Sequence, residues 1–371
     1  MRPAEWIRDF RNRLVGDPRF RARVEKSKLT QWLANRQAER LFALCTGFVH
    51  SQILVAFVSL GLPARLAQGA LDLDELADAT GLPRKRLARL LDGAGALDLV
   101  EPRTGGRWAL GPLGAALLEN DGLARLVLHH DALYRDLADP VALVAGAAES
   151  GRLRRYWAYA DRDCPGEADG AAVAGYTRTM AASQAMIAAQ VVDDSSFADR
   201  RRLLDIGGGD GTFAIAAARR WPALRVTVAD LPAVAALARD NIGRAGLEDR
   251  IETIALDFLR DPLPAGHDCA TLVRILHDHD DAAVARLLEA ARAALTPGGR
   301  LLVVEPMAGG DAGGRLVKAY FSLYLLAMGQ GRPRTPAELT ASLETAGFEK
   351  IRLTSPLAGI VSRVLRADNP A

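Results

Sequence analysis

Five short apolar runs alternate with helical stretches after Arg200, and this alternation restricts the fold more than any other feature of the sequence. The runs lie at residues 201–206, 225–230, 250–256, 268–276 and 300–306. Strands covered on both faces read as nearly continuous apolar runs, and parallel strands need a crossover that is usually a helix. The pattern predicts an α/β fold in which a Rossmann-like, mainly parallel sheet carries helices on both faces.

A second folding pattern precedes the sheet. Residues 71–97 read as two helices joined by a turn, and residues 98–111 read as a hairpin around a Gly-Gly turn. Two helices followed by a hairpin form a winged helix, and the Ala- and Leu-rich residues 123–192 add further helices. We therefore predict a helical, winged-helix domain at 1–165 and a Rossmann-like domain at 166–371.

Four basic side chains on the second of these helices raise the question of DNA binding. They are Arg84, Lys85, Arg86 and Arg89. The whole chain has 47 Lys and Arg against 45 Asp and Glu, a formal net charge of +2. Because binding to nucleic acid depends on a concentrated positive surface, this balance argues against a nucleic-acid partner.

The first apolar run ends in an acidic residue, Asp205, and a glycine-rich loop follows that opens a helix. Gly207 and Gly209 allow the backbone to approach a ligand closely and to adopt angles closed to other residues. A dinucleotide-binding loop would have a third glycine where Thr212 stands, and no Gly-Lys-Ser/Thr motif follows. The loop therefore fits neither of these two phosphate-binding classes.

Further acidic residues follow the next two apolar runs. Asp230 ends the second run, where a carboxylate can accept hydrogen bonds from ribose hydroxyls, and Asp257 with Phe258 follows the third. One aspartate alone would read as a cap of the following helix, but three at successive strand ends favour a ligand site. A ligand that has adenosine, a positive charge and no phosphate fits these groups, and we predict S-adenosylmethionine.

The fourth run leads into two histidines and three aspartates at 277–281, and the fifth ends in Glu305. Side chains alternate in direction along a strand end, so we expect His277 and His279 to share a side while the acids diverge. The last two acids read as the cap of the next helix, and we expect no metal site. His277 suits a general base whose tautomer Glu305 would hold, although a solvated loop acid is an equal alternative for Glu305.

Taken in order, these segments resemble the S-adenosylmethionine-dependent O-methyltransferases of the caffeate and hydroxyindole type. The shared features are the winged helix, LDIGGGDG, VADLP, LDF, ILHD, LTPGGRLLVVEP and GRPRTPAEL, and they cover nearly the whole chain from about residue 40. Longer runs such as LCTGFVHSQ, LHDHDD and KAYFSLYLLAMGQGRPRT resemble the bacterial branch that serves carotenoid biosynthesis. The resemblance implies that the winged-helix domain mediates homodimerisation and does not bind DNA.

The resemblance also implies roles for single residues. His277 matches the family's proton acceptor, and Glu305 matches one of two glutamates that flank it. Pro333 stands in place of the second glutamate, and His279 stands in place of the usual tryptophan. The residues that we predict to bind S-adenosylmethionine are Asp205, Gly207, Gly209, Asp230, Leu231, Asp257, Phe258 and Arg274.

The acceptor implied by the narrower resemblance is an acyclic hydroxycarotenoid, which needs a long apolar channel. Residues 316–331 carry too many apolar side chains for one helix stripe, so we expect them to serve both a pocket and a subunit interface. Further candidates are Phe48, Tyr134 and Met186, and the residues predicted to bind the acceptor are Met180, Asp278, Tyr320, Tyr324 and Met328. The alternatives are a C-methyltransferase of a bacteriochlorophyll-type pigment, and a winged-helix regulator whose methyltransferase half only binds ligand.

The N-terminal segment is basic. Residues 1–40 hold eleven Lys or Arg and five Asp or Glu, a net charge of +6, and apolar residues recur there at helical spacing from Trp6 to Leu14. We expect this arm to pack on a partner subunit, with peripheral contact to anionic lipid of photosynthetic membranes as the alternative.

Residues 41–64 contain no Asp, Glu, Lys or Arg, a stretch long enough to cross a bilayer. His50, Ser51 and Gln52 lie at its centre, however, and burying them in lipid without partners would be costly. We expect a helix buried in protein, for which an interface between subunits is one arrangement. The three cysteines are far apart in the sequence and show no paired spacing, so we expect a cytoplasmic protein without disulfides.

Overall fold

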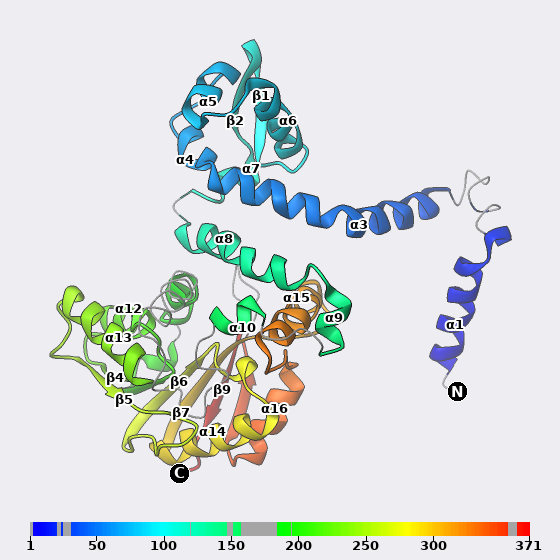
Figure 1. The fold of residues 1–371 in the computed structure, drawn as a ribbon. Coiled ribbons are helices and arrows are strands. Elements are labelled where there is room, and N and C mark those ends of the chain that lie inside the picture. The colour runs from blue at the N-terminus through cyan, green and yellow to red at the C-terminus, as the bar shows by residue number, and fades with distance from the viewer. Residues whose placement is uncertain are drawn as a thin grey trace. The chain divides into compact units, whose positions relative to one another are not determined.

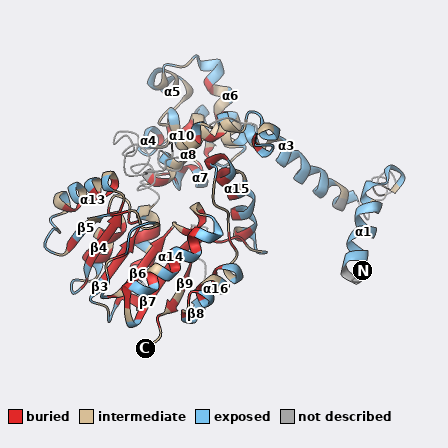
Figure 2. Cartoon of the chain, turned by 60° about the horizontal axis from the view of Figure 1, so that its bottom comes forward, coloured by how far each residue is buried: buried red, intermediate tan, exposed pale blue. Residues whose placement is uncertain are grey.

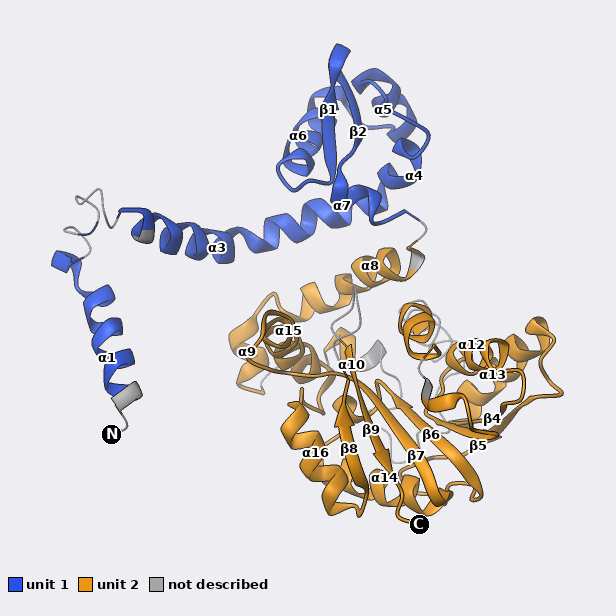
Figure 3. Cartoon of the chain, turned by 180° about the vertical axis from the view of Figure 1, so that it is seen from behind, with its two compact units in different colours: residues 1–118 blue, residues 119–371 orange. Residues whose placement is uncertain are grey.

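The structure is a computed structural model and describes residues 3–20, 24, 31–118, 120–146, 151–156, 184–193, 195–354 and 362–371. The chain forms two compact units, residues 1–118 and residues 119–371 (Figure 3). The domain boundary predicted at 165/166 lies outside the described residues. The division into units comes earlier than that boundary, because the helices at 121–156 belong to the second unit.

The first unit contains the predicted winged helix. Its elements are α4 (Leu62–Leu66), α5 (Leu73–Thr80), α6 (Arg84–Gly95), β1 (Val100–Arg103), β2 (Arg107–Leu110) and α7 (Pro112–Ala115). A capping box starts α5, in which the Asp72 carboxylate accepts from the N–H of Glu75 (2.9 Å) and the Glu75 carboxylate accepts from the N–H of Asp72 (2.7 Å). β1 and β2 pair antiparallel around Gly105 and Gly106, which have φ values of +75° and +72°. The hairpin is thus confirmed.

Two longer helices precede the winged helix, α1 (Pro3–Gly16) and α3 (Gln31–Ser59). Among the described helices, only the part of α3 at Ala34–Ser59 is long and apolar enough to cross a membrane by length and composition. Only 6% of the most apolar 18-residue window of α3 is buried, and Figure 2 shows the helix largely exposed. The described residues of this chain therefore do not supply the protein contacts that we expect to bury this helix.

The second unit is built on a seven-stranded sheet with the order β5-β4-β3-β6-β7-β9-β8. The strands are β3 (Arg202–Ile206), β4 (Arg225–Asp230), β5 (Ile251–Ala255), β6 (His267–Val273), β7 (Leu295–Pro306), β8 (Glu349–Leu353) and β9 (Ser362–Asp368). The first five are parallel and correspond to the five apolar runs, whereas β9 lies antiparallel between β7 and β8. The predicted α/β fold is confirmed.

Helices cover both faces of the sheet, as the ribbon shows (Figure 1). α12 (Thr212–Arg220) and α13 (Pro232–Ala245) pack on one face, and α14 (Asp281–Ala294) and α16 (Pro336–Thr345) on the other. Successive residues of β3 serve opposite cores, because side chains alternate along a strand. Leu203 packs with the α12 side and Leu204 with the α14 side, and both are fully buried.

The strand order places a crevice at the carboxyl ends of β3 and β6. These two strands are neighbours, yet the chain leaves β3 toward β4 and leaves β6 toward β7, on opposite sides. Where connections diverge in this way, an open parallel sheet has its ligand-binding crevice. The glycine loop and the histidine cluster follow these two strands and therefore meet there.

A helical cluster in the same unit adds a further buried core. α8 (Asp121–Asp136), α9 (Pro140–Val144) and α10 (Arg152–Tyr156) pack with α15 (Ala312–Met328), which follows β7 (Figure 1). The buried side chains of this core include Leu133, Leu143, Leu153, Phe321, Leu325 and Met328. The cluster brings residues from the middle of the chain beside a helix near its end.

Candidate active site

Two buried aspartates lie at the carboxyl ends of β3 and β4. Asp205 accepts a hydrogen bond from the hydroxyl of Thr271 (2.7 Å), and its Oδ2 atom is buried without a hydrogen-bond partner. Asp230 accepts hydrogen bonds from the N–H groups of Gly209 (2.8 Å) and Leu231 (2.7 Å). Asp230 therefore ties the end of β4 to the glycine loop, and both carboxylates retain lone pairs that can accept from a ligand.

Burial raises the pKa of both carboxyl groups. The pKa of Asp205 is raised to about 7 by burial, which outweighs the hydrogen bond from Thr271 and is assisted by the charge of Asp230. Burial likewise raises the pKa of Asp230 to about 6, although two backbone N–H groups act in the opposite direction. A positively charged ligand would favour the ionised carboxylates, so this rim suits a cation better than a phosphate.

Packing and backbone conformation explain why positions 207 to 209 of the loop are glycines. Gly207 has a φ of +68°, and a Cβ atom there would lie 2.5 Å from the Cδ1 atom of Ile275. Gly208 has no room either, because its Cβ atom would lie 2.6 Å from the Asp205 carboxylate. Gly209 has a φ of +62°, but a Cβ atom there would meet only the Gln184 amide, at 4.0 Å. Among the described residues, the loop is therefore open beside Gly209 and closely packed at Gly207 and Gly208.

The residues after β5 have different surroundings. The Asp257 carboxylate accepts from the N–H of Leu259 (3.0 Å) and lies 3.5 Å from the Arg260 guanidinium, both within its own turn. The Phe258 ring instead packs edge-on against the ring of His279, with centroids 5.8 Å apart. Phe258 thus faces the histidine turn, while the contacts described for the Asp257 carboxylate are local.

A single buried carboxylate organises the turn that carries His277. The chain leaves β6 and forms a short 3-10 turn, Leu276–Asp278. Glu305, near the end of β7, is 2% exposed, and its Oε1 atom accepts from the N–H groups of Ile275 (2.8 Å) and Leu276 (2.7 Å). Its Oε2 atom lies 2.6 Å from Nδ1 of His277. With the Nδ1 proton donated to Glu305, the Nε2 atom of His277 is left to exchange a proton.

A second carboxylate lies at the other ring nitrogen. Asp278 Oδ1 is 3.2 Å from Nε2 of His277, so the expectation that these neighbours diverge is wrong. The reason is that both belong to a tight helical turn and not to a strand end, where directions would alternate. Asp280 caps α14 as expected and accepts from the N–H of Ala283 (2.7 Å).

The two carboxylates set the protonation of His277. Burial on its own would lower the pKa of His277, but the nearby Asp278 and Glu305 carboxylates outweigh it and the pKa is raised. Burial also raises the pKa of Asp278. The imidazole is therefore protonated up to a higher pH than a free histidine, and it can accept a proton only above its raised pKa.

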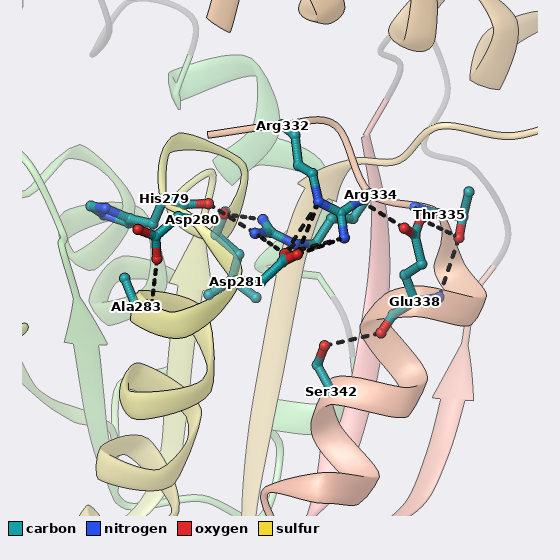
Figure 4. Close-up of polar contacts among 10 residues, drawn as sticks. His279, Asp280, Asp281, Ala283, Arg332, Arg334, Thr335, Glu338 and Ser342 are labelled. Carbon is teal, nitrogen blue, oxygen red and sulfur yellow. Dashed lines mark hydrogen bonds and ion pairs between the residues drawn. The ribbon is translucent and has the colours of Figure 1, made fainter. Parts of the chain in front are cut away.

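Arg334 holds the same turn from the other side (Figure 4). This arginine is 3% exposed and donates hydrogen bonds to the carbonyl oxygens of Leu276 (2.5 Å) and His279 (2.8 Å). It also pairs with Asp281 at the start of α14 (2.7 Å), and Arg332 pairs with the same carboxylate (3.1 Å). Arg334 was not predicted from the sequence, because its partners lie more than fifty residues earlier in the chain.

Two histidine–tyrosine pairs connect α8 to α15. Nε2 of His129 lies 3.0 Å from the Tyr324 hydroxyl, and Nε2 of His130 lies 2.7 Å from the Tyr320 hydroxyl. Burial lowers the pKa of both histidines, that of His129 to about 4, so both rings are neutral near pH 7. Tyr320 and Tyr324 were predicted to bind the acceptor, but the two histidines were not identified.

Phe321 connects these pairs to the histidine turn. Its ring packs edge-on against the imidazole of His277, with centroids 5.3 Å apart, and against the ring of Tyr320 at 4.9 Å. The structure therefore brings the α15 aromatic residues to the same place as His277. Met328 is buried in the helical cluster, and Met180 lies outside the described residues.

The remaining candidates are Arg274 and the metal-ligating side chains. Arg274 follows β6 with a φ of +59°, and its N–H donates to the carbonyl of Val304 (2.8 Å). Over the part of the chain that the structure describes, no three His, Cys, Asp or Glu side chains gather as a metal site would require.

Comparison with known proteins identifies two families of domains. A family model of the O-methyltransferase domain matches residues 156–349, and a model of the O-methyltransferase dimerisation domain matches residues 42–120. Among solved structures, the S-adenosylmethionine-dependent methyltransferase SibL in its apo form aligns with a TM-score of 0.74 and 31% identity, covering 90% of this chain and 99% of SibL. Human N-acetylserotonin methyltransferase in complex with SAM aligns with a TM-score of 0.73 and 26% identity, covering 90% and 98%.

Curated relatives match over similar lengths. Demethylspheroidene O-methyltransferase of Cereibacter sphaeroides is 39% identical, over 97% of this chain and 94% of that protein, and its Rhodobacter capsulatus counterpart is 38% identical, over 97% and 89%. These two matches leave only 3% of this chain uncovered. Residues 1–41 make up 11% of its 371 residues, so the matches include most of them. Acetylserotonin O-methyltransferase of Mus musculus is 33% identical over 86% of each chain.

Gly331 offers a test of how strictly the histidine turn must be held. Its φ is +81°, and a Cβ atom there would collide with the carbonyl oxygen of His277. We expect Gly331→Ala to displace the turn and to lower kcat at least about tenfold, since small misplacements of catalytic groups are costly. Steady-state methyl-transfer kinetics would measure this.

Gly310→Ala is the matched control, because a Cβ atom there meets nothing within 4 Å. We expect this variant to keep its activity. Equal activity of Gly331→Ala and Gly310→Ala would contradict the close fit between the 331–334 segment and the turn.

Proposed function

The chain belongs to the S-adenosylmethionine-dependent O-methyltransferases, and we propose that it methylates the tertiary C1-hydroxyl of an acyclic carotenoid such as hydroxyneurosporene or demethylspheroidene. The geometry that carries the methyl-transfer proposal is the buried His277, whose Nδ1 is bonded to Glu305 beside the rim formed by Asp205 and Asp230. The acceptor is supported by the two bacterial relatives named for demethylspheroidene, which match nearly the full chain.

S-adenosylmethionine supplies the reaction with a methyl group on a positively charged sulfur. We assign the ribose hydroxyls to Asp230, whose carboxylate already lies against the loop backbone at Gly209. The unpartnered oxygen of Asp205 and the raised pKa values at this rim suit a ligand that brings positive charge. The further residues assigned to this ligand are Gly207, Leu231, Asp257, Phe258 and Arg274.

His277 acts as the general base in this proposal. A tertiary alcohol is a very weak acid, so no free alkoxide accumulates, and Nε2 accepts the hydroxyl proton as the oxygen–carbon bond forms. Glu305 keeps the Nδ1 proton on its side of the ring and stabilises the imidazolium that results. Because positive charge moves from sulfur to the imidazole and is not created, burial of the site does not oppose the reaction.

We further propose that the protein is a cytoplasmic homodimer. α3 exposes Phe42, Leu44 and Phe48, and the match to a dimerisation domain begins at residue 42. A second copy of the chain would cover these side chains and would supply the burial that the single chain lacks. This assignment agrees with a helix buried between subunits and leaves no need for a membrane span.

The acceptor is tested by incubating the purified protein with labelled S-adenosylmethionine and a panel of hydroxycarotenoids, phenols and chlorins in detergent. We expect methyl ethers of the acyclic 1-hydroxycarotenoids to form with the highest kcat/KM. A preference for phenols would contradict the carotenoid acceptor. Carbon-methylated chlorins would favour a C-methyltransferase, and binding of duplex DNA without any methyl transfer would favour a regulator.

His277→Ala tests the general base. We expect methyl transfer to fall by about 10²–10⁴-fold, because this is the usual contribution of a positioned base, while S-adenosylmethionine still binds. Kinetics with the preferred acceptor and calorimetry of the cofactor would give the two readouts. Activity within about threefold of the unchanged protein would be too small a loss for a general base.

Asp278→Asn tests the protonation of the histidine. The unchanged enzyme should gain activity as pH rises through the raised pKa of His277, because only the neutral imidazole accepts a proton. Removing the Asp278 charge takes away one cause of the raised pKa, so the acidic limb of the kcat/KM profile should move to lower pH. A changed KM with an unmoved acidic limb would mean that Asp278 only binds the acceptor.

A further inference from the structure

We propose that α1 docks the enzyme on the surface of an anionic lipid bilayer, with its apolar side chains inserted at the level of the headgroups. The inference rests on the proposed acceptor, since an acyclic carotenoid is almost entirely hydrocarbon and dissolves in a bilayer and not in water. α1 contains none of the residues assigned to the methyl-transfer site, so its surface is a separate feature of the molecule.

The helical spacing gathers the apolar residues of α1 on one side. With about 100° per residue, Trp6, Phe10, Leu14 and Ile7 fall within an arc of about 100°. Such an arc is the width of the apolar face of an amphipathic helix. No charged residue of α1 falls inside it, so the face is continuous over about two and a half turns.

These side chains are exposed to solvent and already packed together. Trp6, Ile7 and Phe10 are 55%, 60% and 51% exposed, and the rings of Trp6 and Phe10 stack with centroids 5.4 Å apart. Aromatic rings of this kind favour the boundary between headgroups and acyl chains. The side chains that α1 exposes are therefore of the type that such a boundary binds.

The charges of α1 fit the phosphates of a bilayer. On the same helical projection, Arg13 lies about 20° beyond one border of the apolar arc and Arg11 about 40° beyond the other. Glu5 lies about 150° from the centre of the arc, where it would face water, and Asp9 lies about 60° beyond the same border as Arg13. Long arginine side chains at the borders can reach phosphate while the apolar face is inserted. The positions of Arg11 and Arg13 therefore suit binding to a negatively charged surface.

The net charge of residues 1–40 also favours binding to a negatively charged surface. Residues 1–40 carry +6, so the other residues carry −4, as the chain total is +2. Basic segments near a membrane are attracted to anionic lipids by about 1 kcal/mol for each Lys or Arg. The N-terminal segment is therefore drawn to an anionic surface, while the rest of the chain is weakly repelled.

A lipid surface explains α1 better than a second copy of the chain does. The dimerisation-domain match starts at residue 42, so it accounts for the apolar surface of α3 and does not reach α1. We had expected an arm packed on a partner subunit, and that occupant becomes an outcome of the test.

Co-sedimentation of the full-length protein with vesicles tests the proposal without any acceptor present. Vesicles of phosphatidylcholine with about 30% phosphatidylglycerol are compared with pure phosphatidylcholine, because anionic lipid attracts basic segments. We expect binding to the anionic vesicles, weakened by salt, and a blue shift of tryptophan fluorescence that is reduced when Trp6 is replaced. The variant Trp6→Ala/Phe10→Ala should bind at least about tenfold more weakly, and Arg11→Ala/Arg13→Ala about 25-fold more weakly.

Val15→Ala, which removes an exposed apolar side chain that lies outside the arc, is the control and should bind like the unchanged protein. All variants should keep their methyl-transfer activity on acceptor in detergent, because α1 lies outside the site. Equal binding to both kinds of vesicle, or full binding by Trp6→Ala/Phe10→Ala, would overturn the proposal. A loss of dimer in that variant without lipid would assign α1 to the partner subunit. Since the acceptor panel is run without vesicles, failure of the proposed function would be seen separately.

Discussion

The bonds made by the Glu305 carboxylate are the interaction on which the rest of the site depends. One oxygen accepts from two consecutive backbone N–H groups and so fixes the turn after β6, while the other fixes the imidazole of His277. Because Glu305 is carried by β7, an interior strand that is paired with β6 on one side and β9 on the other, the sheet sets the position of the ring. A buried carboxylate with all these bonds satisfied is stable where an unpaired one would be costly.

The opposite side of the turn is held without the second glutamate that the family usually has. Pro333 stands at that position, and the neighbouring Arg334 instead donates to the carbonyl oxygens of Leu276 and His279. The Arg334 guanidinium holds the backbone of the turn, and the carboxylate that lies at Nε2 of His277 is that of Asp278. The chain therefore keeps two carboxylates at the imidazole, but takes one of them from the turn.

The strands and the rim residues were predictable because they depend on local pattern. Apolar runs gave the five parallel strands, and acidic residues at their ends had to meet at one edge of the sheet. The contact of Asp278 with His277 was missed because the sequence does not distinguish a strand end from a 3-10 turn. Arg334 and the α8 histidines were missed because their partners lie about 55 and 190 residues away, and only tertiary packing brings them together.

The paired hydroxyls and imidazoles between α8 and α15 have a consequence for the medium around the reacting groups. Each tyrosine hydroxyl already has a ring nitrogen as partner, and both rings are uncharged near neutral pH. These four side chains thus satisfy one another's polar atoms and bring no charge into the helical cluster. The surroundings of Phe321, which packs on both Tyr320 and His277, therefore stay weakly polar although they contain four polar side chains.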